Sequence, residues 1–264
     1  TCKHIEKEGG EVTYLKVKDN GLVDLAELEA AIKPNTILIA LMYANNEIGT
    51  VMPMKEISAI AKKHGVLVFS DAVQAVGKIP VDVNKDGIDL MAFTAHKMYG
   101  PKGVGVAYVN PLVKIEPLIA GGEQENGLRA GTYNIPGIIG LAEALALVYQ
   151  ERTDYLKRVK KLRDYLWSRI KQEIPDVYLN GSLDKRTPNN LNIMFRRIEG
   201  EAILIDLSMN GICVSTGSAC SAHNLKASYV LQAIGLVDDN LNSNIRFSLG
   251  KFNTKEEIDY TVDN

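Results

Sequence analysis

Cysteine is scarce in this sequence. The 264 residues include three cysteines, Cys2, Cys213 and Cys220. A small, odd number in a chain of this length argues against a disulfide-stapled fold. No two of them form a C-x-x-C pair, so we expect neither a structural zinc site nor any other metal centre. Reduced thiols are usual in the cytoplasm, which is the location we expect.

The sequence also lacks an excess of charge of either sign and a long apolar run. Its 30 Lys and Arg residues against 32 Asp and Glu residues give a formal net charge of −2 at pH 7. This balance argues against a nucleic-acid partner, since such proteins usually carry a basic excess. No apolar stretch is long enough to cross a bilayer, so no membrane association is expected. With 46% hydrophobic and 23% charged residues, the composition is that of a globular protein with a substantial core.

Both ends have the pattern of interior segments. There is no initiator Met, and residues 1–12 resemble the inside of a helix that runs into a strand. No apolar segment of the kind found in signal peptides follows Thr1. Residues 255–264 begin a helical pattern and stop within it. We therefore expect the natural protein to extend beyond both ends.

The first two thirds of the chain alternates apolar runs with a helical pattern. Residues 36–42 form a continuous apolar run, which is typical of a strand buried on both faces. Residues 53–64 have helical spacing, with Pro53 suited to the first turn and Gly65 to the stop. Further apolar runs predict strands at residues 66–69, 90–93 and 103–109. This alternation predicts an α/β domain with a mostly parallel sheet.

From about residue 135 the pattern changes. A long helical stretch runs to about residue 172, and its charged middle, residues 151–154, is a candidate bend between domains. A mixture of short strands and helices follows, which predicts a small α+β domain. The strands are expected at 191–195, 213–215 and 244–249, and the helices at 201–209 and 227–234. We therefore expect two domains, a large one over residues 1–150 and a small one over residues 151–264.

Polar residues follow three of the predicted strands. They occupy residues 45–49, 70–74 and 94–97. In open parallel sheets, ligands bind beyond the carboxyl ends of the strands, so three such tails in succession predict one crevice. Lys97 stands at the third strand end. If Lys97 is partly desolvated, its pKa is lowered and its amine is nucleophilic enough to form a Schiff base. The alternative is that Lys97 is an ordinary solvated lysine in a loop. Asp71 lies in the second tail. It is either a second functional group of this crevice or a residue that caps a helix or turn.

Five segments of the chain resemble NifS/IscS-type cysteine desulfurases, in the order in which that family carries them. These enzymes are a class V aminotransferase branch of the fold-type I enzymes that use pyridoxal 5′-phosphate (PLP). The resemblance extends over nearly the whole chain, and five motifs in order are far more specific than one. The segments are residues 44–49 (ANNEIG), 69–78 (FSDAVQAVGK), 94–103 (TAHKMYGPKG), 127–132 (GLRAGT) and 215–220 (STGSAC).

The resemblance implies a role in cofactor binding for each matching position. Lys97 would carry PLP as a Schiff base and move the substrate protons. Asp71 would pair with the pyridinium nitrogen, and Gln74 would hydrogen-bond the phenolic oxygen. Thr94 and His96 would bind the phosphate. Thr132 would reach the phosphate in the neighbouring subunit, which implies a homodimer.

The resemblance also implies the reaction. Asn46 and Arg246 would hold the carboxylate of L-cysteine, a task that suits the planar fork of arginine. Cys220 would take the substrate sulfur as a persulfide and leave L-alanine. The alternative for a free cysteine is a buried small hydrophobe, which suits Cys213 in its apolar surroundings better than Cys220. The loop around Cys220 is long, as in the branch that supplies an iron–sulfur scaffold protein; another sulfur acceptor, including one in tRNA thiolation, remains open.

Two kinds of alternative function stay open at this point. One is a related PLP enzyme, such as a selenocysteine lyase or another class V aminotransferase-like enzyme, and the other is an inactive form without cofactor. Cys220 favours desulfuration, because an aminotransferase has no use for a nucleophilic thiol.

We predict that the 264-residue chain alone binds PLP weakly. In the family, a glycine-alanine-threonine phosphate loop and a histidine that stacks on the ring would both precede Thr1. Titration with PLP, followed through the absorbance of the Schiff base, measures the affinity. A near-stoichiometric signal that disappears in Lys97→Ala would contradict the prediction.

Overall fold

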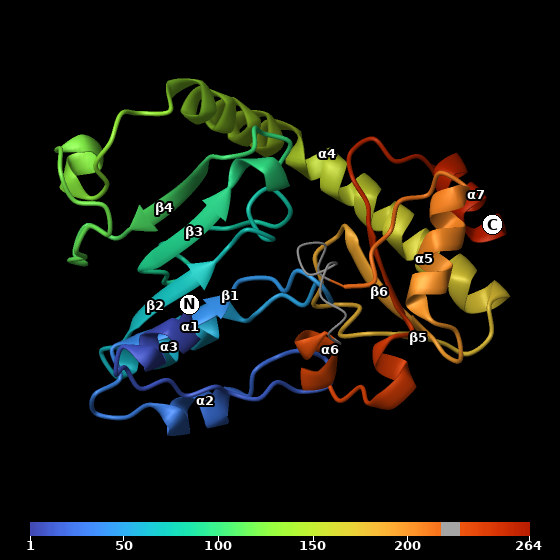
Figure 1. Ribbon diagram of the computed structural model, residues 1–264, viewed down its shortest axis with the longest axis horizontal. Coiled ribbons are helices and arrows are strands. Elements are labelled where there is room, and N and C mark those ends of the chain that lie inside the picture. The colour runs from blue at the N-terminus through green and yellow to red at the C-terminus, as the bar shows by residue number, and fades with distance from the viewer. Residues whose placement is uncertain (218–227) are drawn as a thin grey trace.

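The structure, a computed structural model, describes residues 1–217 and 228–264 and contains two β-sheets in that part of the chain (Figure 1). The larger sheet has the strand order β1 (Leu38–Met42), β2 (Leu67–Asp71), β3 (Leu90–Thr94), β4 (Gly105–Val109). The first three strands run parallel, and β4 pairs antiparallel with β3. The prediction of an α/β fold with a mostly parallel sheet is confirmed.

Strand β1 is more exposed than its apolar sequence predicts. It lies at the edge of the larger sheet, and Leu38 is 39% exposed. Ile37, directly before the strand, is 79% exposed. The expectation that residues 36–42 are buried on both faces is therefore wrong. An apolar run does not reveal whether its strand occupies the centre or the edge of a sheet.

Helix α3 (Met54–Lys63) has nearly the bounds that the sequence predicts. Pro53 is its N-cap, and after His64 the chain turns at Gly65 with φ at +68°. The helix packs against β2 through an apolar face. Its buried side chains are Met54, Ile57 and Ala61. Two shorter helices, α1 (Cys2–Lys7) and α2 (Leu25–Ala31), precede it in the chain.

Helix α4 (Ile135–Glu173) runs past both sheets without a break (Figure 1). The bend proposed at residues 151–154 is wrong, because after Gly140 no glycine or proline interrupts the helix and the charged side chains there are mostly turned to solvent. Leu141 and Val148 belong to the core of the larger sheet, whereas Val159 and Leu166 belong to the core of the smaller one. A domain division at residue 150 stays a prediction, and we propose that it falls within α4 where the buried face changes partner.

The smaller sheet is antiparallel, in the order β5 (Val177–Leu179), β6 (Asn190–Phe195), β7 (Asn244–Ser248). Helix α5 (Gly200–Met209) packs against β7, and α7 (Lys255–Asp263) packs against α4. The strand expected at residues 213–215 is present only as a single bridge between Ser215 and Arg246. Helix α6 (Tyr229–Ala233) is shorter than the expected helix, whose residue 227 lies outside the described residues.

The loop after β1 joins the two sheets. The backbone oxygen of Glu47 accepts hydrogen bonds from the side-chain amides of Asn190 (3.0 Å) and Asn192 (3.3 Å). Thr187 N–H donates to the oxygen of Gly49 (3.0 Å). Ile48, which is 1% exposed, packs with α6. These contacts place β6 directly beside the loop that follows the carboxyl end of β1.

We predict that Gly49→Ala lowers the free energy of unfolding by roughly 2 kcal/mol or more. Gly49 has φ at +72°, and a Cβ there would lie 2.6 Å from Oδ1 of Asn190. Gly65→Ala is the matched control, since its φ is +68° but no atom lies within 4 Å of its Cβ. The control should lose only about 1 kcal/mol, the cost of the left-handed conformation. Urea unfolding measures both variants, and equal losses would show that the contact with Asn190 contributes nothing.

Candidate active site

A cavity of about 620 Å³ lies where β1, β2 and β3 end, between the two sheets. Polar and charged side chains from both sheets line it. Its lining includes Asn45, Asn46, Asp71, Gln74, Lys78, His96, Lys97, Tyr99, Tyr155, Asn189, Tyr229 and Arg246. The crevice predicted from the three polar strand tails is therefore present.

Six of the residues singled out from the sequence line this one cavity: Asn46, Asp71, Gln74, His96, Lys97 and Arg246. They come from three loops of the larger sheet and from β7 of the smaller one, so residues 200 positions apart in the chain meet here. This convergence does not test the individual roles, which stay predictions.

Thr94 stands behind the cavity wall. Its hydroxyl donates to the backbone oxygen of Val104 (3.1 Å) and lies 3.0 Å from Nδ1 of His96. Because the single hydroxyl proton is used by Val104, Thr94 accepts from Nδ1–H, and the other ring nitrogen of His96 is left to face a ligand. Thr94 thus contacts the cavity residue His96, and its own role in binding a phosphate stays a prediction.

Thr132 and the cysteines lie elsewhere. Thr132 is exposed on the segment between β4 and α4, which extends away from the larger sheet (green in Figure 1), and it does not line the cavity. Cys220 lies outside the described residues. Cys213 is exposed, so the expectation of a buried cysteine is wrong for it; its neighbours Ile212 and Val214 are the partly buried residues of this segment.

Asp71 is both a turn cap and a residue of the cavity. Oδ1 accepts a hydrogen bond from the backbone N–H of Val73 (3.0 Å), which is a turn cap. The carboxylate nevertheless lines the cavity, and the cap orients it there. Lys97 follows β3 in a short 3-10 turn and is exposed. The partial desolvation expected for Lys97 is therefore not observed, because this wall of the cavity is open to solvent.

Arg246 is more than a charge on the surface of a strand. It lies on β7, and its Nη1 donates to the backbone oxygen of Asn46 (3.0 Å). Its backbone also pairs with Ser215. The two residues predicted to hold a substrate carboxylate are thus in direct contact across the junction of the sheets.

Lys78 is a cavity residue that sequence reasoning missed. Its ammonium group donates to Oε1 of Gln74. Burial lowers the pKa of Lys78 to about 8, and the positive charges of Lys97 and Arg246 act in the same direction. Its place four residues after Gln74, within a segment of family-like sequence, was the available signal.

Two tyrosines close one side of the cavity. The hydroxyl of Tyr99 accepts from the backbone N–H of Lys251 (2.9 Å) and lies 3.2 Å from the hydroxyl of Tyr155. Burial raises the pKa of Tyr155. Tyr99 has φ at +68°, an uncommon value for a large side chain, so its conformation is held by these contacts.

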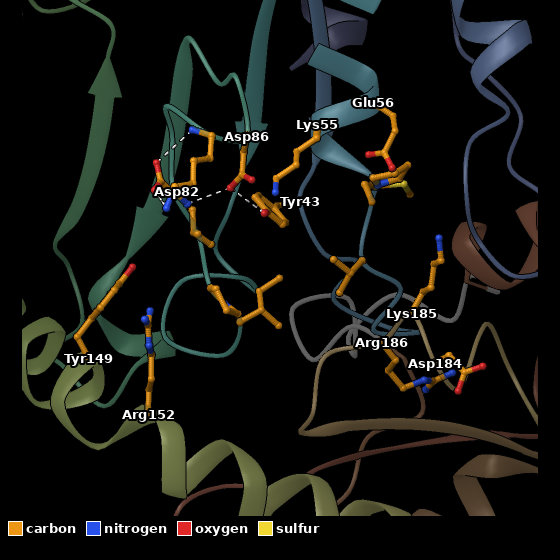
Figure 2. Close-up of a pocket in the computed structure, with 17 residues that line it drawn as sticks. Tyr43, Lys55, Glu56, Asp82, Asp86, Tyr149, Arg152, Asp184, Lys185 and Arg186 are labelled. Carbon is orange, nitrogen blue, oxygen red and sulfur yellow. Dashed lines mark hydrogen bonds and ion pairs between the residues drawn. The ribbon is translucent and has the colours of Figure 1, made fainter. Parts of the chain in front are cut away.

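A larger cavity of about 770 Å³ has a different character (Figure 2). Tyr43 donates from its hydroxyl to Oδ2 of Asp86 (3.0 Å), and the backbone N–H of Asp82 donates to the same oxygen (2.9 Å). Burial, followed by the bond to Asp86, raises the pKa of Tyr43. These polar groups are hydrogen-bonded to one another. None of the site residues predicted from the sequence lines this cavity. We therefore assign the candidate site to the smaller one.

The donor set of the smaller cavity fits PLP. Three cations, Lys78, Lys97 and Arg246, suit a ligand with phosphate and carboxylate groups. Asp71 is the carboxylate that a protonated ring nitrogen requires, and Gln74 offers an amide to a ring oxygen. Within residues 1–217 and 228–264 no group of three His, Cys, Asp or Glu side chains is placed to hold a metal ion.

The chain matches the model of the aminotransferase class V family over residues 1–261 and therefore belongs to that family. It is 49% identical over 262 residues to a cysteine desulfurase IscS from Dictyoglomus turgidum, covering 99% of this chain and 66% of that protein. It is 45% identical over 265 residues to the IscS of Pectobacterium carotovorum, covering 100% and 65%. The chain thus spans about two thirds of the length of these curated relatives.

Solved structures agree with this assignment. A NifS-like protein superposes with a TM-score of 0.91 at 39% identity, covering 99% of this chain and 69% of the other. The NifS-like protein from Rickettsia africae superposes with a TM-score of 0.90 at 30% identity, covering 99% and 70%. The resemblance stated from five sequence segments, and the fold-type I architecture that it implies, are confirmed. Among the helices of the described residues, none has the length and apolar character of a membrane span.

We predict that Lys78 makes the stability of the unliganded protein depend on pH between 8 and 10.5. Its pKa is lowered on folding, so over this range the unfolded chain binds more protons and the free energy of unfolding rises with pH. Below pH 8 both states are protonated and the cost is constant. The shift corresponds to at most about 3 kcal/mol. Urea unfolding of the parent and Lys78→Met should show this rise in the parent only.

Lys161→Met is the control, because Lys161 is exposed on α4. It should keep the pH dependence of the parent. A Lys78→Met variant with the same pH dependence as the parent would contradict the assignment.

Proposed function

We propose that this protein is a PLP-dependent cysteine desulfurase that converts L-cysteine to L-alanine and retains the sulfur on Cys220 as a persulfide. The observation that carries the proposal is the convergence of Asp71, Gln74, His96, Lys97 and Arg246 on one cavity at the strand ends. The names of the curated relatives support the choice of reaction.

Each cavity residue has a place in this proposal. Lys97 would carry PLP through its amine, Asp71 would pair with the ring nitrogen, and Gln74 would bind the phenolic oxygen. His96, oriented by Thr94, would bind the phosphate. When bound, PLP supplies an electron sink that stabilises negative charge on the substrate α-carbon. Lys97, once its amine is free, would remove and return protons there.

The substrate would be oriented by its carboxylate. Arg246 is held by its bond to the backbone of Asn46, so its guanidinium is fixed at the cavity before any ligand arrives. The Cys220 thiolate would then attack the substrate sulfur. The S–S bond forms as the Cβ–S bond breaks, the electron pair passes to the carbon, and a proton completes alanine. The role of Cys220 rests on the family resemblance, since this residue lies outside the described residues.

A homodimer is part of the proposal. The segment between β4 and α4 exposes large apolar side chains, including Leu112 (91%) and Leu118 (99%), and Ile139 on α4 is 63% exposed. Thr132 lies on this segment, away from the cavity of its own chain. A second copy packed here would cover the apolar residues and receive Thr132 at its own site. We further propose a cytoplasmic protein that hands sulfur to an iron–sulfur scaffold protein or another acceptor.

We predict that two substitutions separate the cofactor step from the sulfur step. Lys97→Ala should abolish both PLP attachment and alanine formation, because it removes the only amine assigned to both tasks. In the protein as it is naturally made, Cys220→Ala should keep PLP attached and lose at least about 100-fold in sulfide release, since no thiol accepts the sulfur. The measurements are absorbance of bound PLP, alanine by chromatography and sulfide after reduction.

Cys213→Ala is the matched control, because Cys213 is an exposed cysteine outside the cavity. It should behave as the parent. Alanine and sulfide formed at the parental rate by Cys220→Ala would exclude the proposed persulfide, and transamination without sulfide would favour the aminotransferase alternative.

A further inference from the structure

Lys78 has no part in the proposed function so far, yet it is built into the cavity wall. It is partly buried, lines the same cavity as Lys97, and bonds to Gln74. Burying a cation costs free energy unless hydrogen bonds or an opposite charge compensate for the lost water. The positive charges of Lys97 after β3 and Arg246 on β7 act on it, and Asp71 at the end of β2 lines the same cavity.

The bond between Lys78 and Gln74 determines the orientation of the glutamine amide. An ammonium group only donates, so its partner on Gln74 must be the carbonyl oxygen Oε1. The amide cannot rotate by 180° without placing its NH₂ group against the ammonium. The group that Gln74 presents to a ligand is therefore NH₂, which only donates.

A glutamine without this anchor is ambiguous. Its oxygen and nitrogen are similar in size, so it can offer either a donor or an acceptor to a ligand. A site that must bind an oxygen carrying negative charge requires the donor every time. The positive charge of Lys78 adds to this selection by favouring the anionic form of the ligand oxygen.

We propose that Lys78 is a positioning residue that holds Gln74 as a hydrogen-bond donor and thereby selects a ligand with an anionic ring oxygen. The proposal rests on the function proposed above and deepens it, since the phenolic oxygen of PLP is such a group. Lys78 acts through Gln74 and is not assigned a contact with the ligand.

The test compares two ligands that differ only at the ring oxygen. PLP and 3-deoxypyridoxal 5′-phosphate are titrated by equilibrium dialysis into the protein as it is naturally made, in the parent and in Lys78→Met. The variant should bind PLP about tenfold more weakly, the usual effect of one charge-assisted hydrogen bond, and 3-deoxypyridoxal 5′-phosphate less than about twofold more weakly. Lys78→Arg should restore most of the PLP affinity, because it again offers only donors to Oε1.

Coupling to Gln74 is tested in the Gln74→Ala background. There, Lys78→Met should weaken PLP less than about twofold further, since both substitutions remove the same interaction. Lys161→Met, on the exposed face of α4, should change neither ligand. Equal weakening of both ligands by Lys78→Met would overturn the proposal and leave Lys78 as a plain source of charge, and unchanged PLP binding would overturn it as well.

A second readout keeps this inference separate from the proposed cofactor. The side-chain NH₂ signals of Gln74 in a ¹⁵N-labelled sample without ligand should shift in Lys78→Met and not in Lys161→Met. If the parent binds no PLP, the proposed function fails, while these signals still decide whether Lys78 orients Gln74. Unshifted signals would overturn the inference whatever the cofactor result.

Discussion

The candidate site depends on the docking of the loop after β1 against the smaller sheet. Three backbone oxygens of this loop, those of Asn46, Glu47 and Gly49, accept hydrogen bonds from residues beyond position 186. The donors Asn190 and Asn192 are 5% and 0% exposed, so losing these bonds would leave buried amides unsatisfied. Without the docking, Arg246 would not face Lys97, and the cavity would have one wall.

The positive charges that line the cavity favour an anionic ligand. Lys78 has its pKa lowered to about 8 by burial and by the nearby charges of Lys97 and Arg246, so positive charges repel one another in this cavity. A ligand with phosphate and carboxylate groups would relieve this repulsion, and binding would then stabilise the fold. The same cations that favour the ligand thus reduce stability in its absence. Asp71 offsets them only in part, because it is one carboxylate against three cations in the described lining.

Sequence patterns were reliable where the determining forces are local. The bounds of α3 follow from Pro53 and Gly65, and the polar tails after β1, β2 and β3 predict the place of the cavity. They failed where distant parts of the chain decide. The edge position of β1, the unbroken course of α4 and the exposure of Cys213 all depend on packing partners that no short window contains. The sequence did not identify Lys78 for the same reason, because its properties depend on the combined presence of Gln74, Lys97 and Arg246.

Glu47 joins the docking loop to the start of α6. It is 2% exposed, and its Oε2 accepts from the hydroxyl of Ser228 (2.5 Å), the N-cap of α6. Gly217 and Ser228 are the described residues on either side of the segment that contains Cys220. The buried carboxylate of Glu47 therefore anchors Ser228, the residue that follows that segment, to the loop that also carries Asn46. Ser228 and Arg246, which come from separate elements, are thus bonded to the neighbouring residues Glu47 and Asn46, so a change in the docking of the loop after β1 would disturb both contacts together.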